Sequence, residues 1–182
     1  MEKKENKVSF YVCCFLVYCI LGWIYEVIWE FAIGNGFVNR GFLYGPYLPI
    51  YGFGVLILLF TLKDLMKKKT KLFNINITPI IVFIAILFIV SVVEFFASYV
   101  MELIFHKRWW DYSYDILNLN GRISLRNSSL LAIGGMAFIY LVQPVLEKIF
   151  SKFKSTTLNK IARTIITVVG LDFIITILGY IL

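Results

Sequence analysis

Charge, histidine and cysteine are scarce in this sequence. Charged residues make up 16% of its 182 residues, and it contains one histidine, His106, and three cysteines. It has no GxxxxGK[ST] phosphate-binding loop, no GxSxG nucleophile motif and no HExxH zinc motif. Cys13, Cys14 and Cys19 form no CxxC pair, and we expect them to be apolar packing residues. These absences argue against a self-contained ATPase or hydrolase, and we expect no catalytic residue, no metal site and no cofactor.

Apolar sequence dominates instead. The chain is 60% hydrophobic with a mean hydropathy of +0.82, which is more apolar surface than a soluble domain of this length could bury. A helix needs about 20 apolar residues to cross a bilayer. The segments between the charged clusters predict one all-α integral membrane domain over residues 1–182, a polytopic helical bundle. Its five expected transmembrane helices cover residues 8–33, 47–63, 78–105, 129–147 and 161–182.

Lysine and arginine are distributed unevenly along the chain. Thirteen of the 18 lie before the first span or at residues 63–71 and 148–163, and five lie in the other two loops. The positive-inside rule then predicts a cytoplasmic N-terminus and an external C-terminus in a bacterial cytoplasmic membrane. No small-x-small cleavage site follows the first apolar run, so we expect a retained helix. The basic clusters border the spans, which predicts contact with a lipid bilayer and no nucleic acid.

The positions of the arginines, and of the acids inside the predicted spans, suggest that the functional residues lie on the predicted outer side. Four of the five arginines lie there, whereas twelve of the thirteen lysines lie on the inner side, and arginine can pair bidentately with carboxylate or phosphate. An ionised side chain near the membrane centre costs at least about 2.5 kcal/mol. Five acids nevertheless lie inside the predicted spans, namely Glu26, Glu30, Glu94, Glu102 and Asp172. For Asp172 we keep three alternatives: protonation, pairing with threonine and backbone groups of a neighbour, or a subunit interface.

The segment NRGFLYGPYLPIYGFG, residues 39–54, combines four glycines and two prolines with Arg40. Glycine allows close backbone approach, and Pro46 and Pro49 fix bends at the start of the second span. Irregular backbone at membrane depth is tolerated only where it is buried in protein or lines a wet cavity. We predict that residues 37–49 fold back, in a re-entrant or folded-back outer loop, and aim Arg40 at the acids. The alternative is an exposed interfacial loop with an aromatic belt.

A second outer segment, residues 106–129, contains WWDYS and NLNGRISL. Trp110 and Tyr112 are expected at the membrane interface, with Asp111 between them. Asn120-Gly121 predicts a turn, and Arg122 follows it directly. We therefore expect a lid or a re-entrant hairpin here.

Taken together, GWIYE, NRGFLYGPYLPIYGFG, EFFASYVME, WWDYS and NLNGRISL resemble the CmpB-like family known as Putative ABC-transporter type IV, over about residues 10–175. The resemblance implies transport but no substrate. Because the chain has no ATP-binding motif, the resemblance implies a separate ATPase, docking at residues 64–77 or 148–160. The positions that match the family pattern are Gly22, Trp23, Glu26, Asn39, Arg40, Gly41, Gly45, Pro46, Pro49, Tyr51, Gly52, Glu94, Trp110, Asp111, Tyr112, Asn120, Gly121 and Ser124.

Three functions are compatible with these residues. The first is a transporter or transport-system component that binds a small anionic ligand or a lipid headgroup in an outer-facing pocket, with the acids positioning the arginines or coupling binding to H⁺ or a metal cation. The second is a structural membrane protein in which the same charges form an internal network and the partner is another membrane protein or a second copy. The third is an enzyme acting on a lipid headgroup, with Glu94 or Glu102 as general base. The candidate ligand-binding residues are Arg40, Arg122, Glu26, Glu30, Glu94, Glu102, Asp111, Tyr112, Trp110, Asn39 and Tyr51.

Overall fold

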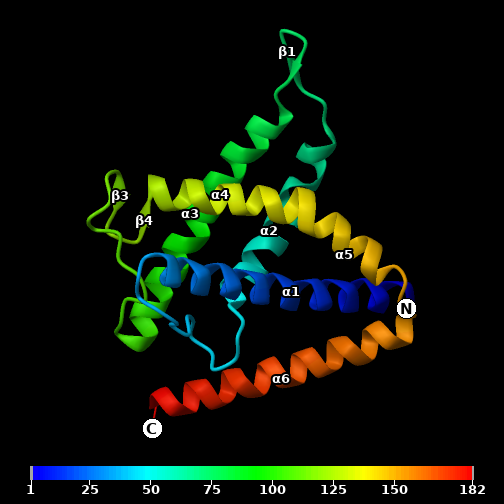
Figure 1. The fold of residues 1–182 in the computed structure, drawn as a ribbon. Helices are drawn as coiled ribbons and strands as arrows, with labels where there is room; N and C mark the ends of the chain where they lie inside the picture. Colours follow the sequence, from blue (N-terminus) through cyan, green and yellow to red (C-terminus); the bar gives the residue numbers. More distant parts are fainter. Residues whose placement is uncertain (1, 182) are drawn as a thin grey trace. The chain divides into compact units, whose positions relative to one another are not determined.

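The computed structural model describes the backbone of residues 2–181 and the side chains of residues 7–180. The side chains of Lys3 and Lys4, and the predicted end of the fifth span at residue 182, lie outside the described part of the chain. The chain is mainly helical (Figure 1). Its helices are α1 (Glu2–Ala32), α2 (Pro49–Lys67), α3 (Thr78–Phe105), α4 (Leu125–Ala137), the π-helix η1 (Phe138–Val142), α5 (Gln143–Phe150) and α6 (Ser155–Ile181). Four short strands, β1 (Lys71–Leu72), β2 (Ile75–Asn76), β3 (Asn118–Leu119) and β4 (Ile123–Ser124), form two antiparallel hairpins.

Five helical segments are long and apolar enough to cross a membrane: Lys7–Ala32, Pro49–Lys67, Thr78–Phe105, Leu125–Phe150 and Ser155–Tyr180. The prediction of an all-α polytopic membrane protein with five spans is confirmed. The fourth and fifth segments begin earlier than predicted because each starts with a polar turn. In the fourth, the Ser124 hydroxyl accepts a hydrogen bond from the backbone N–H of Asn127 and caps the helix. An apolar run alone does not reveal such a start.

The fourth span is interrupted by the π-helix Phe138–Val142, which ends directly before Gln143 and Pro144. Proline has no backbone N–H to donate, and its ring clashes with the carbonyl four residues earlier in an α-helix. A π-helical turn is one of the usual ways in which a helix accommodates such a defect. This interruption was not predicted from the sequence.

Contacts divide the chain into two compact units, which are described separately. The first unit contains the residues up to Leu56 and those from Gln143 onward, and the second unit contains Ile57–Val142. The expectation that the whole chain acts as one membrane domain stays a prediction.

In the first unit, α1 and α6 lie side by side and run in the same direction (Figure 1). The Ser9 hydroxyl donates to Asn159 Oδ1 at 2.6 Å near the start of both helices, and Cys19 and Val169 share a hydrophobic cluster further along. Parallel first and last spans are what an odd number of crossings requires. Cys13 is buried with residues of α6, so the cysteines pack in the core as expected.

In the second unit, α3 packs against α4. Adding a Cβ to Gly135 of α4 would bring it 2.8 Å from Ile86 Cγ2 of α3, so the two helices approach closely there. The core around this contact is apolar and contains Leu58, Leu62, Val82, Ile86, Ala132 and Ile139. The buried polar residues Glu94 and Ser98 of α3 and Ser128 of α4 lie toward the other end of the same helix pair, where the second candidate cluster described below is found.

Candidate functional site

The segment between α1 and α2 folds back along α1. The backbone N–H of Leu48 donates to the carbonyl of Cys19 at 3.0 Å, and Leu43 and Tyr47 are buried beside Cys19. Cys19 lies in the middle of α1, about 20 Å from the helix end at a rise of 1.5 Å per residue. The prediction of a folded-back loop is therefore confirmed.

This loop brings Arg40 to two glutamates of α1. Arg40 Nε lies 3.6 Å from Glu26 Oε2, and Arg40 Nη1 lies 3.5 Å from Glu30 Oε1. The Tyr51 hydroxyl donates to Glu26 at 2.6 Å, and the side-chain amide of Asn35 donates to Glu30 at 2.6 Å. We call these five residues the first cluster. The expectation that the loop aims Arg40 at the acids holds for Glu26 and Glu30.

Arg40 retains hydrogen-bonding capacity in the first cluster. Its side chain is 36% exposed, and both ion pairs are longer than an N–H···O hydrogen bond. A guanidinium has five N–H donors. Among the described residues, no side chain or carbonyl accepts a hydrogen bond from it. The geometry therefore leaves Arg40 able to bind a carboxylate or phosphate from outside the chain.

Asn39 fixes the start of the loop. Trp23 Nε1 of α1 donates to Asn39 Oδ1 at 2.8 Å, and the Asn39 amide lies 3.4 Å from the carbonyl oxygen of Tyr44, to which it donates. These bonds hold the backbone on one side of Arg40 against α1.

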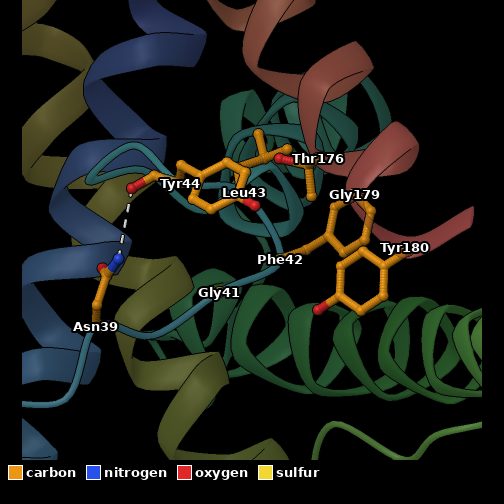
Figure 2. Close-up of a pocket in the computed structure, with 8 residues that line it drawn as sticks. All are labelled: Asn39, Gly41, Phe42, Leu43, Tyr44, Thr176, Gly179 and Tyr180. Atoms are coloured by element: carbon orange, nitrogen blue, oxygen red, sulfur yellow. Dashed lines mark hydrogen bonds between the residues drawn. The ribbon is translucent and has the colours of Figure 1, made fainter. Parts of the chain in front are cut away.

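A pocket of about 270 Å³ lies between this loop and the C-terminal part of α6 (Figure 2). Its aromatic wall is formed by Phe42 and Tyr180, whose rings stack with centroids 5.5 Å apart. Asn39 and Gly41, the two sequence neighbours of Arg40, both line it. The complete lining is Asn39, Gly41, Phe42, Leu43, Tyr44, Thr176, Gly179 and Tyr180.

Asp172 of α6 anchors the loop. Its carboxylate accepts hydrogen bonds from the backbone N–H groups of Tyr44 at 3.2 Å and Gly45 at 2.9 Å, and from the Tyr47 hydroxyl at 2.5 Å. The Thr176 hydroxyl, one turn along α6, donates to it at 3.3 Å. Of the alternatives open for Asp172, the structure shows pairing with threonine and backbone groups. Burial, and then the bond to Asp172, raise the pKa of the Tyr47 phenol above its ordinary value.

A second cluster lies in the second unit, where residues 106–124 fold onto the end of α3. Arg122 pairs with one carboxylate oxygen of Glu102 and donates to the Ser98 hydroxyl at 3.1 Å. Arg108 Nε donates to the other oxygen of Glu102 at 3.1 Å. The Tyr99 ring lies 5.2 Å from the Arg122 guanidinium, within cation–π range. Together these five residues form the second cluster.

Glu94 connects the same segment to both helices. Its Oε1 accepts hydrogen bonds from the Tyr112 hydroxyl at 2.9 Å and from the side-chain amide of Asn127 at 2.8 Å. Tyr112 belongs to the folded segment and Asn127 to α4. Because Glu94 is buried on α3, these bonds fix the position of the segment relative to the helix pair.

The remaining predicted residues stabilise the segment itself. Trp110 Nε1 donates to the carbonyl of Arg122 at 2.9 Å. Asp111 accepts bonds from the Ser113 hydroxyl and backbone N–H, and these bonds lower the pKa of Asp111. The predicted turn is confirmed: Gly121 has φ +67°, and a Cβ there would lie 2.4 Å from Ser113 Oγ.

The predicted site residues thus fall into two groups, with Arg40, Glu26, Glu30, Asn39 and Tyr51 in the first unit and Arg122, Glu94, Glu102, Trp110, Asp111 and Tyr112 in the second. The model of the family described as Putative ABC-transporter type IV matches residues 13–177, which is most of the chain. The chain belongs to this family. Comparisons with curated proteins and with solved structures give no significant match. The five apolar helices and this family fit a multi-pass membrane protein.

Some residues that bond the glutamates were not among the candidate ligand-binding residues predicted from the sequence. Asn35, Arg108 and Asn127 each bond one of the glutamates, and as loop or helix-end residues they stand in no pattern that would single them out. Ser98 did carry a signal, because it lies one turn from both Glu94 and Glu102 on α3.

Proposed function

We propose that the protein is a membrane component of a transport system that binds a polar, anionic ligand, with Arg40 as its principal contact. The observation that carries this proposal is the state of Arg40. Its guanidinium is partly exposed, is held by two glutamates at 3.5–3.6 Å, and makes no hydrogen bond among the described residues. An anion could replace these long ion pairs with short bidentate hydrogen bonds.

The charges of the first cluster predict that anion binding is coupled to the uptake of a cation. The first cluster has two carboxylates for one guanidinium, so a bound anion would leave Glu26 and Glu30 without a positive partner. Uptake of H⁺ or a monovalent cation would restore the balance. Anion binding would then be linked to binding of that cation, because each is favoured by the presence of the other.

The second cluster has the opposite balance. Arg122 and Arg108 share a single carboxylate, Glu102, and the Arg108 side chain is 37% exposed. We propose that Arg122 is the second anion contact of the protein, with Arg108 beside it. Glu94, Trp110, Asp111 and Tyr112 would position the segment that carries these arginines.

The setting of the site is also part of the proposal. The clusters would lie on the outer side of a bacterial cytoplasmic membrane, with the N-terminus inside. A separate ATPase would bind at residues 64–77 or 148–160 on the inner side, since the chain has no ATP-binding motif. A second copy of the chain is a further expected partner.

A second candidate function is structural. It is favoured by Arg122, whose side chain is only 9% exposed and already contacts Glu102, Ser98 and Tyr99. A buried and satisfied arginine of this kind can serve helix packing without any ligand. In that case the protein would act by binding another membrane protein.

Thermal unfolding of the purified protein in a series of anions separates the two candidates. Phosphate, sulfate, small dicarboxylates and glycerophosphate would be tested on wild type, Arg40→Lys and the control Arg126→Lys, whose side chain is 71% exposed. We expect at least one anion to stabilise wild type and Arg126→Lys but not Arg40→Lys, because lysine lacks the bidentate fork. Equal stabilisation of Arg40→Lys would contradict the assignment. No stabilisation of any variant would favour the structural candidate.

A further inference from the structure

The β1–β2 hairpin joins α2 to α3 within the second unit. It extends beyond the ends of these two helices, with its tip pointing away from them (Figure 1). Residues 68–77 form the whole connection, so the tip lies about five residues from either helix. At roughly 3.3 Å per residue, the tip reaches about 10–15 Å past the helix ends.

Phe73, at the tip of the hairpin, is a residue type that this turn disfavours. Phe73 and Asn74 form a two-residue loop with φ +48° and +63°, as a type I′ turn requires. Asn-Gly is the preferred pair in this turn, and a bulky residue at positive φ is strained. Phe73 is also 90% exposed, so its ring contributes little to the stability of the hairpin. Stability of the hairpin therefore does not explain why a phenylalanine occupies position 73.

The hairpin has an apolar face and a polar face. Leu72 pairs with Ile75, and Lys71 pairs with Asn76, in the antiparallel register. Successive pairs in a hairpin point to opposite faces. Leu72 and Ile75 therefore share one face, and both are exposed. With Phe73 at the tip, the hairpin thus carries three exposed apolar side chains at neighbouring positions.

Thr78 fixes the base of the hairpin. Its hydroxyl accepts from the backbone N–H of Thr70 at 2.9 Å and donates to the carbonyl of Lys68 at 2.8 Å. The backbone N–H of Ile77 donates to the carbonyl of Thr70 at 2.9 Å. Thr78 is buried, so these bonds are shielded from water. The hairpin is thus held in place rather than hinged.

Four lysines lie in the sequence at the first side of the hairpin base. Lys67, Lys68, Lys69 and Lys71 lie within five residues, and Asp64 is the only acid between Lys63 and Ile77. Such a cluster favours a carboxylate-rich partner surface.

We propose that the hairpin is a docking element for a protein partner that has an apolar slot, for Phe73, Leu72 and Ile75, bordered by aspartate and glutamate. A strained, exposed aromatic residue on a fixed support has the properties of an interface hot spot, since little conformational entropy is lost on binding. The surface of the protein's own membrane is the less favoured occupant, because the hairpin continues the direction of α2 and α3 and its tip points away from them.

Photo-crosslinking of the full chain in its own cells tests this proposal. The variants Phe73→p-benzoylphenylalanine and Ile75→p-benzoylphenylalanine probe the apolar side, and the same change at Lys71 and Asn76 probes the opposite face. We expect one discrete protein adduct from positions 73 and 75 and little from 71 and 76. The expected adduct lies beside aspartate or glutamate in the partner peptide and is lost in the double variant Lys68→Glu/Lys69→Glu.

Phe73→Gly separates docking from folding. Glycine relieves the positive φ, so the purified variant should unfold at the same or a higher temperature than wild type. Adduct yield from position 75 should nevertheless fall about tenfold or more, as expected on removal of a hot-spot aromatic residue. Equal adducts from both faces, adducts with lipid alone, or an unchanged yield in Phe73→Gly would overturn the proposal.

This docking role rests on the proposed binding of a separate partner at residues 64–77, which include the hairpin, and it does not depend on anion binding at Arg40. We expect Arg40→Lys to give the same adducts as wild type, so that failure of the ligand proposal and failure of the docking proposal are observed separately.

Discussion

The backbone N–H of Gly45 lies 2.9 Å from a carboxylate oxygen of Asp172, which joins the loop after the first span to the last helix of the chain. The same oxygen accepts the Tyr47 hydroxyl, and the other oxygen accepts the backbone N–H of Tyr44. An acid in an apolar helix is thus balanced by donors from the loop that carries Arg40. The loop conformation, and with it the position of Arg40, depends on this contact.

Asp172→Ala should release the loop from α6. The loss of bonds to a charged acceptor typically costs about 1.5–3 kcal/mol each, although partial exposure of Asp172 reduces that figure. We expect a lower unfolding temperature and faster proteolysis within residues 39–47. Thr176→Val is the control, because it removes only the 3.3 Å bond and leaves the loop contacts intact. Identical proteolysis of Asp172→Ala and wild type would show that the anchor is unimportant.

Tyr47 should make the loop sensitive to alkaline pH. Its pKa in the folded protein is raised above the ordinary value of 10.0, so its contribution to stability is complete below pH 10 and is lost as the pH rises through the folded-state pKa. Tyr47→Phe lacks this ionisation. We therefore expect the stability difference between wild type and Tyr47→Phe to shrink above pH 10, measured by denaturant unfolding. A constant difference across that range would contradict the raised pKa.

Gly52 and Gly54 provide a matched pair at the start of α2. A Cβ on Gly52 would lie 2.5 Å from Cys19 Sγ and 2.6 Å from the Phe15 ring, whereas a Cβ on Gly54 would meet nothing within 4 Å. Gly52→Ala should destabilise the protein by about 1–3 kcal/mol through overpacking. Gly54→Ala should be neutral or stabilising by up to about 1 kcal/mol, because alanine favours the helix. Similar effects of the two changes would show that the close packing of α1 and α2 is not maintained.

Arg122 and Arg126 should differ although they are four residues apart. Arg122→Gln removes bonds to Glu102 and Ser98 from a nearly buried position, and we expect a loss of about 1.5–3 kcal/mol. Arg126→Gln removes a 3.9 Å pair with Asp115 from an exposed side chain, which should change stability by less than about 0.5 kcal/mol. Unfolding in denaturant measures both changes in stability. Equal losses would contradict the contribution of Arg122 to the stability of the second unit.

Membrane orientation can be tested with an impermeant maleimide on intact cells. The native cysteines are buried, with exposures of 0–2%, so background labelling should be low. Tyr114→Cys lies in the segment predicted to be outside, and Ser151→Cys lies in a turn predicted to be inside. We expect labelling of Tyr114→Cys alone. Labelling of Ser151→Cys alone would reverse the topology.

The spans were predictable because hydrophobic length and the positions of lysine clusters are properties of the sequence alone. The folded-back loop was also predictable, since glycine, proline and an arginine occur together where irregular backbone must be buried. Pairing of Asp172 with threonine and backbone groups was one of the predicted alternatives, but the identity of those backbone groups was not predictable, because nothing in α6 indicates that the N–H groups of residues 44 and 45 lie opposite it. The same is true of Arg108, which shares Glu102 with Arg122 only through the path of the β3–β4 hairpin.

The π-helix before Pro144 shows a different limit. Hydropathy treats Phe138–Val142 as an ordinary part of an apolar helix, and only the backbone shows the wider turn. Gln143, the next residue in the chain, is buried, and its side-chain oxygen accepts a hydrogen bond from the hydroxyl of buried Tyr18. Neither side chain is charged, and the sequence around each is apolar, so neither charge nor hydropathy indicates this pair.

Native mass spectrometry of the purified protein, wild type beside Arg40→Lys, tests the central claim most directly. The proposal predicts a discrete bound anion on the wild type that is absent from the variant, and its mass would give the ligand class. Wild type and variant without any bound species, with Arg40→Lys merely less stable, would contradict ligand binding and identify the first cluster as an internal clamp.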